Sequence, residues 1–369
     1  MSPTRRELIL GGAGAGAALA AAGKLSGVQP AYAQTAVGVN VKDHGAVGDA
    51  VADDTAAIRA AIDAALGKEL TLRAGKLIFP KGIYRITDTL TIAQASAVVE
   101  GVGWSSSSAS LGPGVRGSVL AWDGPAGRPM LRLDYCWGST VTGLRFVGKS
   151  SAKPSAAISL KNVNGNPSLS NFNSLANIWI GNLSGYDTDA EKPQFANGVL
   201  LEGDDVHNDT NLFRNLVIYG CDVGVNIAHQ QYVRNHFATL RTFGCGTGFK
   251  TNATISTSGD NWVMTSSSVA DISLGFAARL SVEGFSSELA HRLLADSDSS
   301  SLTIRDGYWQ LGSKTAGDNV VIDGRRGKGR SFLRLEDFDF TGDGSKVARV
   351  LWDPPAQVFL SNVFGLKQG

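Results

Sequence analysis

The sequence contains little cysteine, little proline and few long apolar runs. Its three cysteines, Cys136, Cys221 and Cys245, are too few for a disulfide scaffold, and no Cys/His spacing is typical of a zinc site. Proline accounts for 11 of 369 residues, and nothing beyond the N-terminal region approaches the roughly 20 apolar residues that a membrane-spanning helix needs. We therefore expect buried cysteines and a mature chain without a membrane anchor.

An excess of charge of one sign is also missing. The chain has 34 Lys and Arg against 33 Asp and Glu, and loss of residues 1–33 would remove three basic residues and one acidic residue, leaving 31 against 32. Binding to a phosphate backbone requires a basic stripe, which a near-neutral chain of this kind does not offer. Nucleic acid is therefore not an expected partner.

The N-terminal region is typical of an export signal. Adjacent Arg5 and Arg6 precede a weakly apolar stretch rich in Gly and Ala at 10–22, and a small-x-small cleavage site follows at 31–33. The arginine pair favours the twin-arginine route. We interpret residues 1–33 as a signal peptide for the twin-arginine translocase and predict a periplasmic or secreted protein. Changing both arginines to lysine should then leave the precursor in the cytoplasm.

The composition of the remaining chain indicates β structure. Glycine is abundant, at 45 residues, and short β-rich runs separated by Gly, Asn, Asp and Ser follow residue 75. Helical periodicity is convincing only at 53–66, where Ile58, Ile62 and Leu66 share one face and an acidic pair stands at the N-terminus. One helix followed by many strands is an unusual order for a β-sandwich.

Internal repeats decide the architecture. Five-residue segments starting at residues 130, 157, 198, 224, 248 and 275 superpose without gaps, at offsets of 27, 41, 26, 24 and 27 residues. Such offsets are typical of a solenoid. The second and fourth residues of each segment should face the core, so Val199, Val225, Phe249 and Phe276 are predicted to stack in register.

A second strand precedes several of these segments. It places Cys221 and Cys245 at equivalent positions of neighbouring coils. Similar pieces continue to the end of the chain, although the phase of the coils stays open between residues 280 and 315. We predict one domain over residues 34–369, an all-β solenoid with a single helix at its N-terminal end.

The opening of this domain resembles a known superfamily. Residues 41–49 and 53–58, followed by 77–86 and 99–103, are similar to the first blocks of pectate-lyase-like proteins, which include phage tailspikes and several glycoside hydrolases. The strong match covers about 39–122. His44 stands where Phe is usual and Ala50 where Gly is usual. The resemblance implies a single-stranded right-handed parallel β-helix whose opening motif caps the first coil, so the aspartates of that motif are expected to be structural.

The resemblance also implies that catalytic groups lie on the outer face of one sheet, in a groove that holds a polysaccharide. The alignment of the repeats gives two outward columns. The first contains Arg132, Ser159, Leu200, Asn226, Lys250 and Ala277, and the second contains Asp134, Lys161, Glu202, Ala228, Asn252 and Arg279. Side chains in one column should be neighbours, because adjacent strands lie about 4.8 Å apart.

Two chemistries fit such a groove. β-Elimination needs a base, for which Lys250 or His229 are candidates, and a partner for the uronate carboxyl, for which Arg279, Arg234 or Asn226 are candidates. Hydrolysis needs two carboxylates, and the candidate pair is Glu202 with Asp204 or Asp205. A non-catalytic glycan-binding or structural β-helix is the third alternative. We predict a lyase first and a hydrolase second.

Further residues are candidates for substrate contact. They are Lys161, Tyr232 and the two aromatic residues of the insertion at 181–195, Tyr186 and Phe195. The acidic turn at 203–209 could bind Ca²⁺, and no other metal or cofactor is predicted. The signatures of polygalacturonases and mannuronan epimerases are absent. The trimer-forming tails of tailspikes are not recognisable either, so a monomer is expected.

Overall fold

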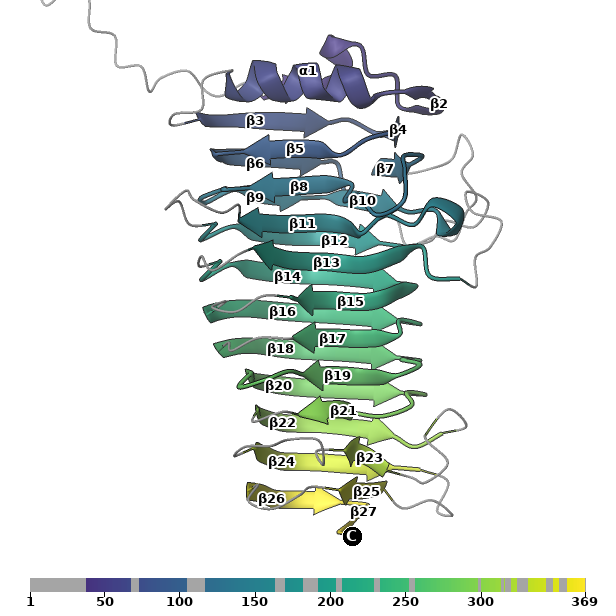
Figure 1. The fold of residues 1–369 in the computed structure, drawn as a ribbon, viewed down its shortest axis with the longest axis vertical. Coiled ribbons are helices and arrows are strands. Elements are labelled where there is room, and N and C mark those ends of the chain that lie inside the picture. The colour runs from purple at the N-terminus through teal and green to yellow at the C-terminus, as the bar shows by residue number, and fades with distance from the viewer. Residues whose placement is uncertain are drawn as a thin grey trace, which may run out of the picture. The chain divides into compact units, whose positions relative to one another are not determined.

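The computed structural model describes residues 38–67, 73–104, 117–162, 170–181, 192–203, 208–228, 233–251, 256–297, 300–312, 315, 320–323, 331–342, 348–351 and 357–368. Within residues 38–369 the chain winds into a stack of parallel β-coils (Figure 1). The predicted signal peptide, residues 1–33, lies outside the described residues. No helix in the described ranges is long and apolar enough to cross a bilayer.

Two parallel sheets run along the stack. Sheet A contains β1 (Val39–Asn40), β3 (Arg73–Phe79), β6 (Ala95–Gly101), β9 (Thr140–Thr142), β12 (Ser174–Ile180), β14 (Leu212–Tyr219), β16 (Val233–Phe243), β18 (Ser256–Thr265), β20 (Arg279–Glu288), β22 (Ser301–Gln310), β24 (Phe332–Thr341) and β26 (Gln357–Phe364). Sheet B contains β5 (Leu90–Ala93), β8 (Leu131–Asp134), β11 (Ala156–Asn162), β13 (Phe195–Gly203), β15 (Cys221–Ile227), β17 (Thr247–Thr251), β19 (Ala270–Leu274), β21 (Leu294–Ser297), β23 (Val320–Asp323), β25 (Ala348–Leu351) and β27 (Leu366–Gln368). The predicted parallel β-helix is confirmed.

A third face is formed because the strands of sheet A bend at one residue. In early coils the bend separates β9 from β10 (Leu144–Val147) at Gly143, and β2 (Asp49–Asp53), β4 (Gly82–Ile86) and β7 (Ser118–Trp122) continue from β10 along this face. In later coils the strand continues through a left-handed residue. These residues are Asn177, Asn215, Thr239, Asn261, Gly284, Asp306, Asp337 and Asn362. All except the threonine are Asn, Asp or Gly, which tolerate positive φ most easily.

Apolar side chains of equivalent positions stack inward. In sheet B, Val199, Val225 and Phe249 are register partners and are fully buried, as predicted. In sheet A, the rings of Phe213 and Phe237 stack with centroids 4.2 Å apart. These rows give the core its continuity from coil to coil.

The prediction for Phe276 is wrong. Ile272 is the register partner of Phe249, and Phe276 is 61% exposed. The glycine before Phe276 resembles the start of other coils, but Gly275 accepts a backbone hydrogen bond from Ala278 in a turn that leads into β20. The strand of this coil therefore ends at Leu274, so Phe276 and the residues after it do not take the places in sheet B that the repeats predicted.

A ladder of buried polar side chains stabilises the corner that leads from sheet B to sheet A. Asn173 accepts a hydrogen bond from the backbone of Ser139, Asn211 from that of Asn173, and Asn235 from that of Asn211, each at 2.9 Å. Each amide thus supplies a partner to a buried N–H of the preceding coil. The sequence analysis did not predict this ladder.

The three cysteines are buried and free, as expected. Cys221 and Cys245 occupy equivalent positions, and their thiols interact directly. Burial raises the pKa of the Cys221 thiol well above its usual range.

The helix α1 (Thr55–Leu66) covers the first coil (Figure 1). Ile58, Ile62 and Leu66 are buried, as the periodicity predicts. The helix packs so closely on β3 that a Cβ at Gly75 would lie 2.0 Å from the Ala65 carbonyl oxygen.

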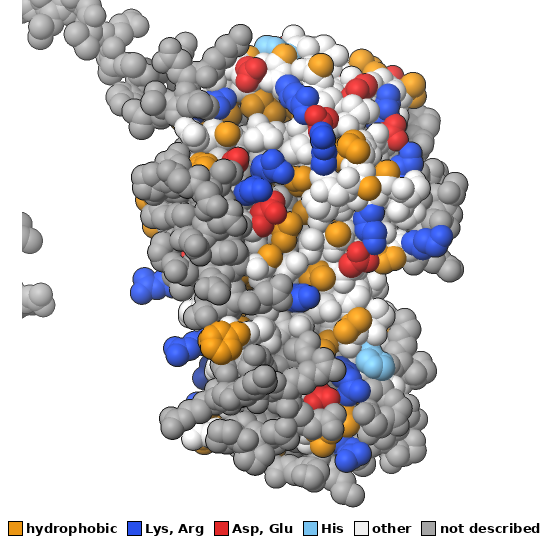
Figure 2. All heavy atoms as spheres, in the orientation of Figure 1, with side chains coloured by type: hydrophobic (Ala, Val, Ile, Leu, Met, Phe, Trp, Pro, Cys, Tyr) orange, Lys and Arg blue, Asp and Glu red, His pale blue; other side chains and the backbone are white. Residues whose placement is uncertain are grey.

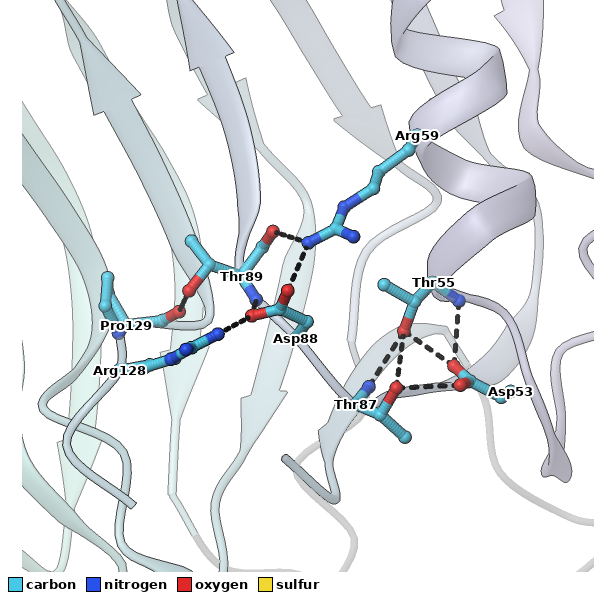
Figure 3. Close-up of polar contacts among 8 residues, drawn as sticks. All are labelled: Asp53, Thr55, Arg59, Thr87, Asp88, Thr89, Arg128 and Pro129. Atoms are coloured by element: carbon cyan, nitrogen blue, oxygen red, sulfur yellow. Dashed lines mark hydrogen bonds and ion pairs between the residues drawn. The ribbon is translucent and has the colours of Figure 1, made fainter. Parts of the chain in front are cut away.

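Acidic residues hold this cap in place. Asp53 accepts hydrogen bonds from the Thr55 backbone N–H and from two threonine hydroxyls, and Asp88 bridges Arg59 and Arg128 at 2.8 Å each (Figure 3). The two guanidinium groups lower the pKa of Asp88 to about 2. Asp54 accepts from the backbone N–H groups of residues 47 and 48. These contacts give the carboxylates of the opening motif a structural role.

One carboxyl group lies in the interior. The Oδ2 atom of Asp271 accepts hydrogen bonds from Ser287 Oγ at 2.7 Å and from Trp309 Nε1 at 2.8 Å, and burial raises the pKa of Asp271 to about 6. The folded state therefore binds this proton more tightly than the unfolded state. The stabilisation that comes from this bound proton is complete below about pH 4 and is lost as the pH rises through about 6.

We predict that Asp271→Asn stabilises the protein above pH 7, by on the order of 2–3 kcal/mol. The amide oxygen can accept the two existing hydrogen bonds, and the amide nitrogen takes the place of Oδ1, which has no hydrogen-bond partner among the described residues. Denaturant unfolding at pH 4.5 and pH 8 measures the effect. If the difference between variant and parent is the same at both pH values, the assignment of this proton to Asp271 is wrong.

Candidate active site

The outer face of sheet B presents the two columns predicted from the repeats. In the first, Arg132, Ser159, Leu200, Asn226 and Lys250 are successive register partners, and in the second, Asp134, Lys161 and Glu202 are. Sheet B lies in front of sheet A in Figure 1, and Figure 2 shows the same side of the molecule, with basic and acidic side chains interspersed over its upper half.

Asp134, Lys161 and Glu202 form a row of alternating charge, which we call the carboxylate row. The two carboxylates are two strand steps apart, which corresponds to about 10 Å between their Cα atoms. Glu202 Oε1 accepts a hydrogen bond from Ser159 Oγ at 2.6 Å, so that one carboxylate is held by a hydroxyl of the neighbouring column.

Asp134 is the perturbed member of this row. Burial raises the pKa of its carboxyl group, the charges of Arg132 and Lys161 lower it, and that of Glu202 raises it. The net effect is a pKa above the usual value of an aspartate. Its Oδ1 atom is buried and has no hydrogen-bond partner among the described residues. The sequence analysis placed Asp134 in the outward column but gave it no catalytic role, because burial cannot be read from the spacing.

A neutral amide pair lies beside the row. Asn226 Nδ2 donates to Asn197 Oδ1 at 2.9 Å, and Asn197 Nδ2 donates to the Ser155 carbonyl oxygen at 2.8 Å. Asn226 Oδ1 is buried and accepts no hydrogen bond from the part of the chain that the structure describes. Lys250 follows on the next coil, partly exposed. At this point the face thus offers a partly exposed cation to a ligand, beside a partly buried amide pair.

Two predicted cations do not lie on this face. The predicted placement of Arg279 is wrong: it is the first residue of β20 in sheet A, opposite Ser256, and Ser273 is the partner of Lys250. The error has the same origin as that for Phe276, the false coil start at 275. Arg234 lies near the start of β16, also in sheet A, and is exposed.

The remaining candidates divide into buried and undescribed residues. Phe195 is fully buried, so it cannot stack on a sugar. Tyr186, Asp204, Asp205, His229 and Tyr232 lie outside the described residues, and so does most of the acidic turn considered for Ca²⁺.

Two exposed aromatic residues near the row were missed. The rings of Trp137 and Phe172, which we call the aromatic ledge, are in contact with centroids 5.3 Å apart, although the residues are 50% and 53% exposed. Trp137 follows Asp134 by three residues, which limits their Cα separation to about 11 Å. Phe172 has a left-handed backbone, at φ 59°, an unfavourable conformation for a bulky residue. Two adjacent exposed aromatic side chains are unusual on a sheet corner.

Comparisons with known proteins agree with this architecture. Residues 38–105 match the family model described as rhamnogalacturonase A/epimerase, pectate lyase-like. A search of curated protein sequences finds no match.

Several solved structures share the fold. The 1,3-α-1,4-β-D-galactose-4-sulfate-3,6-anhydro-D-galactose-2-sulfate 4 galactohydrolase superposes with a TM-score of 0.53, 14% identity, and coverage of 77% of this chain and 73% of that one. The catalytic domain of a GH87 α-1,3-glucanase superposes with a TM-score of 0.51 and 13% identity, over 79% of this chain and 54% of the glucanase domain. The tailspike gp42 of Acinetobacter phage vb_AbaP_AS12 superposes with a TM-score of 0.51 and 9% identity, over 88% of this chain and 62% of the tailspike.

At these identities the likeness extends to the fold, and the chain spans 54% of the glucanase domain and 62% of the tailspike. The resemblance predicted from the opening motif is confirmed: the first coils match a pectate lyase-like family model, and the whole described stack has the parallel β-helix fold of that superfamily.

Proposed function

We propose that this protein hydrolyses a glycosidic bond in a polysaccharide, with Asp134 and Glu202 as the catalytic pair. The observation that carries the proposal is the carboxylate row, in which two carboxylates of different environment lie two strands apart on an outward face. Inverting hydrolases use carboxyl groups roughly 6.5–9.5 Å apart. Side chains on Cα atoms about 10 Å apart can reach that separation.

The environments assign the two roles. Asp134, whose pKa is raised by burial, is the member better suited to donate a proton to the leaving glycosidic oxygen. Glu202 takes a proton from the water that attacks the anomeric carbon from the opposite face. Lys161, between them, can donate to a sugar hydroxyl and balance the negative charge that remains. Two proteins that share the fold, the α-1,3-glucanase and the galactohydrolase, are hydrolases, which supports the same reaction class.

β-Elimination is the second candidate, and Lys250 beside Asn226 supports it. A lysine base could remove the proton next to a uronate carboxyl group, but that carboxyl group also needs a cationic partner. Arg279 and Arg234 lie in sheet A, so the only one of the three predicted partners that lies beside Lys250 is Asn226, a neutral amide. Elimination therefore becomes the less supported reaction.

A substrate screen tests the proposal. The mature chain is incubated with neutral and acidic polysaccharides, and new reducing ends are measured together with the absorbance of unsaturated uronate. Hydrolysis predicts new ends without absorbance. New ends with absorbance would establish elimination, and binding without either product would make the protein a glycan-binding module.

The aromatic ledge fits the same substrate, because aromatic rings provide flat apolar surfaces for the faces of sugars. We predict that Trp137→Ala and Phe172→Ala each raise KM about two- to tenfold and leave kcat nearly unchanged, as expected for loss of uniform binding worth about 0.5–1.5 kcal/mol. Phe276→Ala is the matched control, since Phe276 is equally exposed but lies several coils away. An unchanged KM in both ledge variants would contradict this role.

We further propose that the enzyme acts outside the cytoplasm. The twin-arginine signal predicted at residues 1–33 and a polysaccharide substrate are consistent with each other. Accumulation of the Arg5→Lys, Arg6→Lys precursor in the periplasm at the normal rate would contradict the proposed route.

A further inference from the structure

A second cluster of reactive side chains lies on the outer face of sheet A. His236 of β16 is the register partner of Ser258 of β18, and Asp260 follows two residues later on the same face. His236 Nδ1 is 2.9 Å from Ser258 Oγ, and His236 Nε2 is 2.7 Å from Asp260 Oδ1. Asn261 Nδ2 donates to the other Asp260 oxygen at 3.1 Å.

These contacts determine which nitrogen of His236 carries the proton and therefore which atom donates each hydrogen bond. A carboxylate only accepts, so Nε2 carries the imidazole proton and donates it to Asp260. The lone pair of Nδ1 then accepts the hydroxyl proton of Ser258. A nucleophile, a base and a group that orients the base therefore follow one another in hydrogen-bond contact, as in acyl-transfer enzymes. Ser258 is exposed, and the His236 and Asp260 side chains are 39% and 37% exposed.

The surroundings leave room for a small substrate. Ala238 lies two residues after His236 and is the register partner of Asp260, so a methyl group occupies the surface on that flank of the imidazole, while Leu212 of β14 is the register partner of His236 on the other side. Ser281 is the partner of Ser258 on the next coil and supplies a hydroxyl donor where the carbonyl oxygen of a substrate would become negative. The backbone N–H groups of these strands already donate to neighbouring strands of sheet A. A side-chain donor is therefore required.

We propose that Ser258, His236 and Asp260 form a second catalytic site, which hydrolyses short carboxylic esters such as the O-acyl groups of an acylated glycan. Ser258 Oγ attacks the ester carbonyl carbon while its proton passes to His236 Nδ1. The alkoxide leaves with that proton and an acyl-serine remains. Water, deprotonated by the same nitrogen, releases the carboxylate and regenerates the hydroxyl. The site lies on a different sheet from the carboxylate row and does not depend on the proposed glycosidase activity.

The first test is covalent labelling of the mature protein with a fluorophosphonate, followed by peptide mass spectrometry. The proposal expects labelling at Ser258, loss of labelling in Ser258→Ala, and retention in Ser256→Ala, a change at another exposed serine on the same face of β18. Absence of the label, or its presence on another serine, overturns the proposal.

The second test is hydrolysis of p-nitrophenyl acetate. Ser258→Ala and His236→Gln should each lower the rate at least about 100-fold, and Ser256→Ala should not change it. Asp260 is a positioning residue, so Asp260→Asn should lower kcat and displace the pH profile, because the imidazolium that forms during the reaction loses its negatively charged partner. All these side chains are partly exposed, and melting temperatures should stay within a few degrees of the parent. A rate that survives Ser258→Ala overturns the assignment.

Discussion

Glu202→Gln is expected to lower polysaccharide hydrolysis by about 10²–10⁴-fold without unfolding the protein. Glutamine can still accept the hydrogen bond from Ser159 Oγ, but it cannot take a proton from the attacking water. Asp134→Asn should have an effect of the same order, since an amide cannot protonate the leaving oxygen. Initial rates on the polysaccharide identified by the screen, together with thermal melts, measure both effects.

Lys250→Ala is the control that separates the two chemistries. It lies on the same face but outside the carboxylate row, so hydrolysis predicts retained activity. Elimination predicts the reverse, with activity lost in Lys250→Ala and retained in Glu202→Gln. Full activity in Glu202→Gln and Asp134→Asn would place the catalytic centre elsewhere on the molecule.

Val225→Asp should abolish cooperative folding. Val225 is fully buried between Val199 and Phe249 in the interior row of sheet B, where no described cation can pair with a carboxylate. An unpaired charge there costs several kcal/mol, which is a large part of the stability of a typical domain. Circular dichroism melts and limited proteolysis should show a chain that is unfolded or frayed around these coils.

Val263→Asp is the matched control, with the same substitution on an outward position. Val263 is partly exposed in sheet A, and its register partner is Arg241, so the new carboxylate can remain hydrated beside a cation. Its melting temperature should change little. Equal melting temperatures for Val225→Asp and the parent protein would refute the inward stacking of this row.

The register of sheet B could be predicted because its core positions repeat at nearly regular offsets. Leu131, Ile158, Val199, Val225 and Phe249 pair as the sequence repeats indicated. The prediction fails one coil later, since a glycine followed by a large apolar residue occurs in a turn as well as at the start of a strand. The displaced Phe276 and Arg279 follow from this ambiguity.

The candidate sites depend on features that the repeats do not encode. The role of Asp134 comes from its burial, and the triad on sheet A comes from the pairing of β16 with β18, which lies outside the aligned five-residue segments. His236 and Ser258 are 22 residues apart in the sequence, and no known motif has this spacing. The ledge residues Trp137 and Phe172 lie at a corner, outside the alternating pattern on which the outward columns were based.

The capping helix has a consequence for the behaviour of many copies of the chain together. The last described long strand, β26, exposes Phe359 and Phe364, which are 50% and 66% accessible, and its outer edge has no partner in the described residues. An edge of this kind can template further strands. An endless fibre also requires a free edge at the opposite end, because each added copy must present a surface that accepts the next one. The helix α1 covers that end, with Gly75 allowing it to lie flat on the first coil. Coil-on-coil growth therefore cannot continue past the capped end, and the stack can be long and regular without offering that end as a seed for amyloid-like filaments.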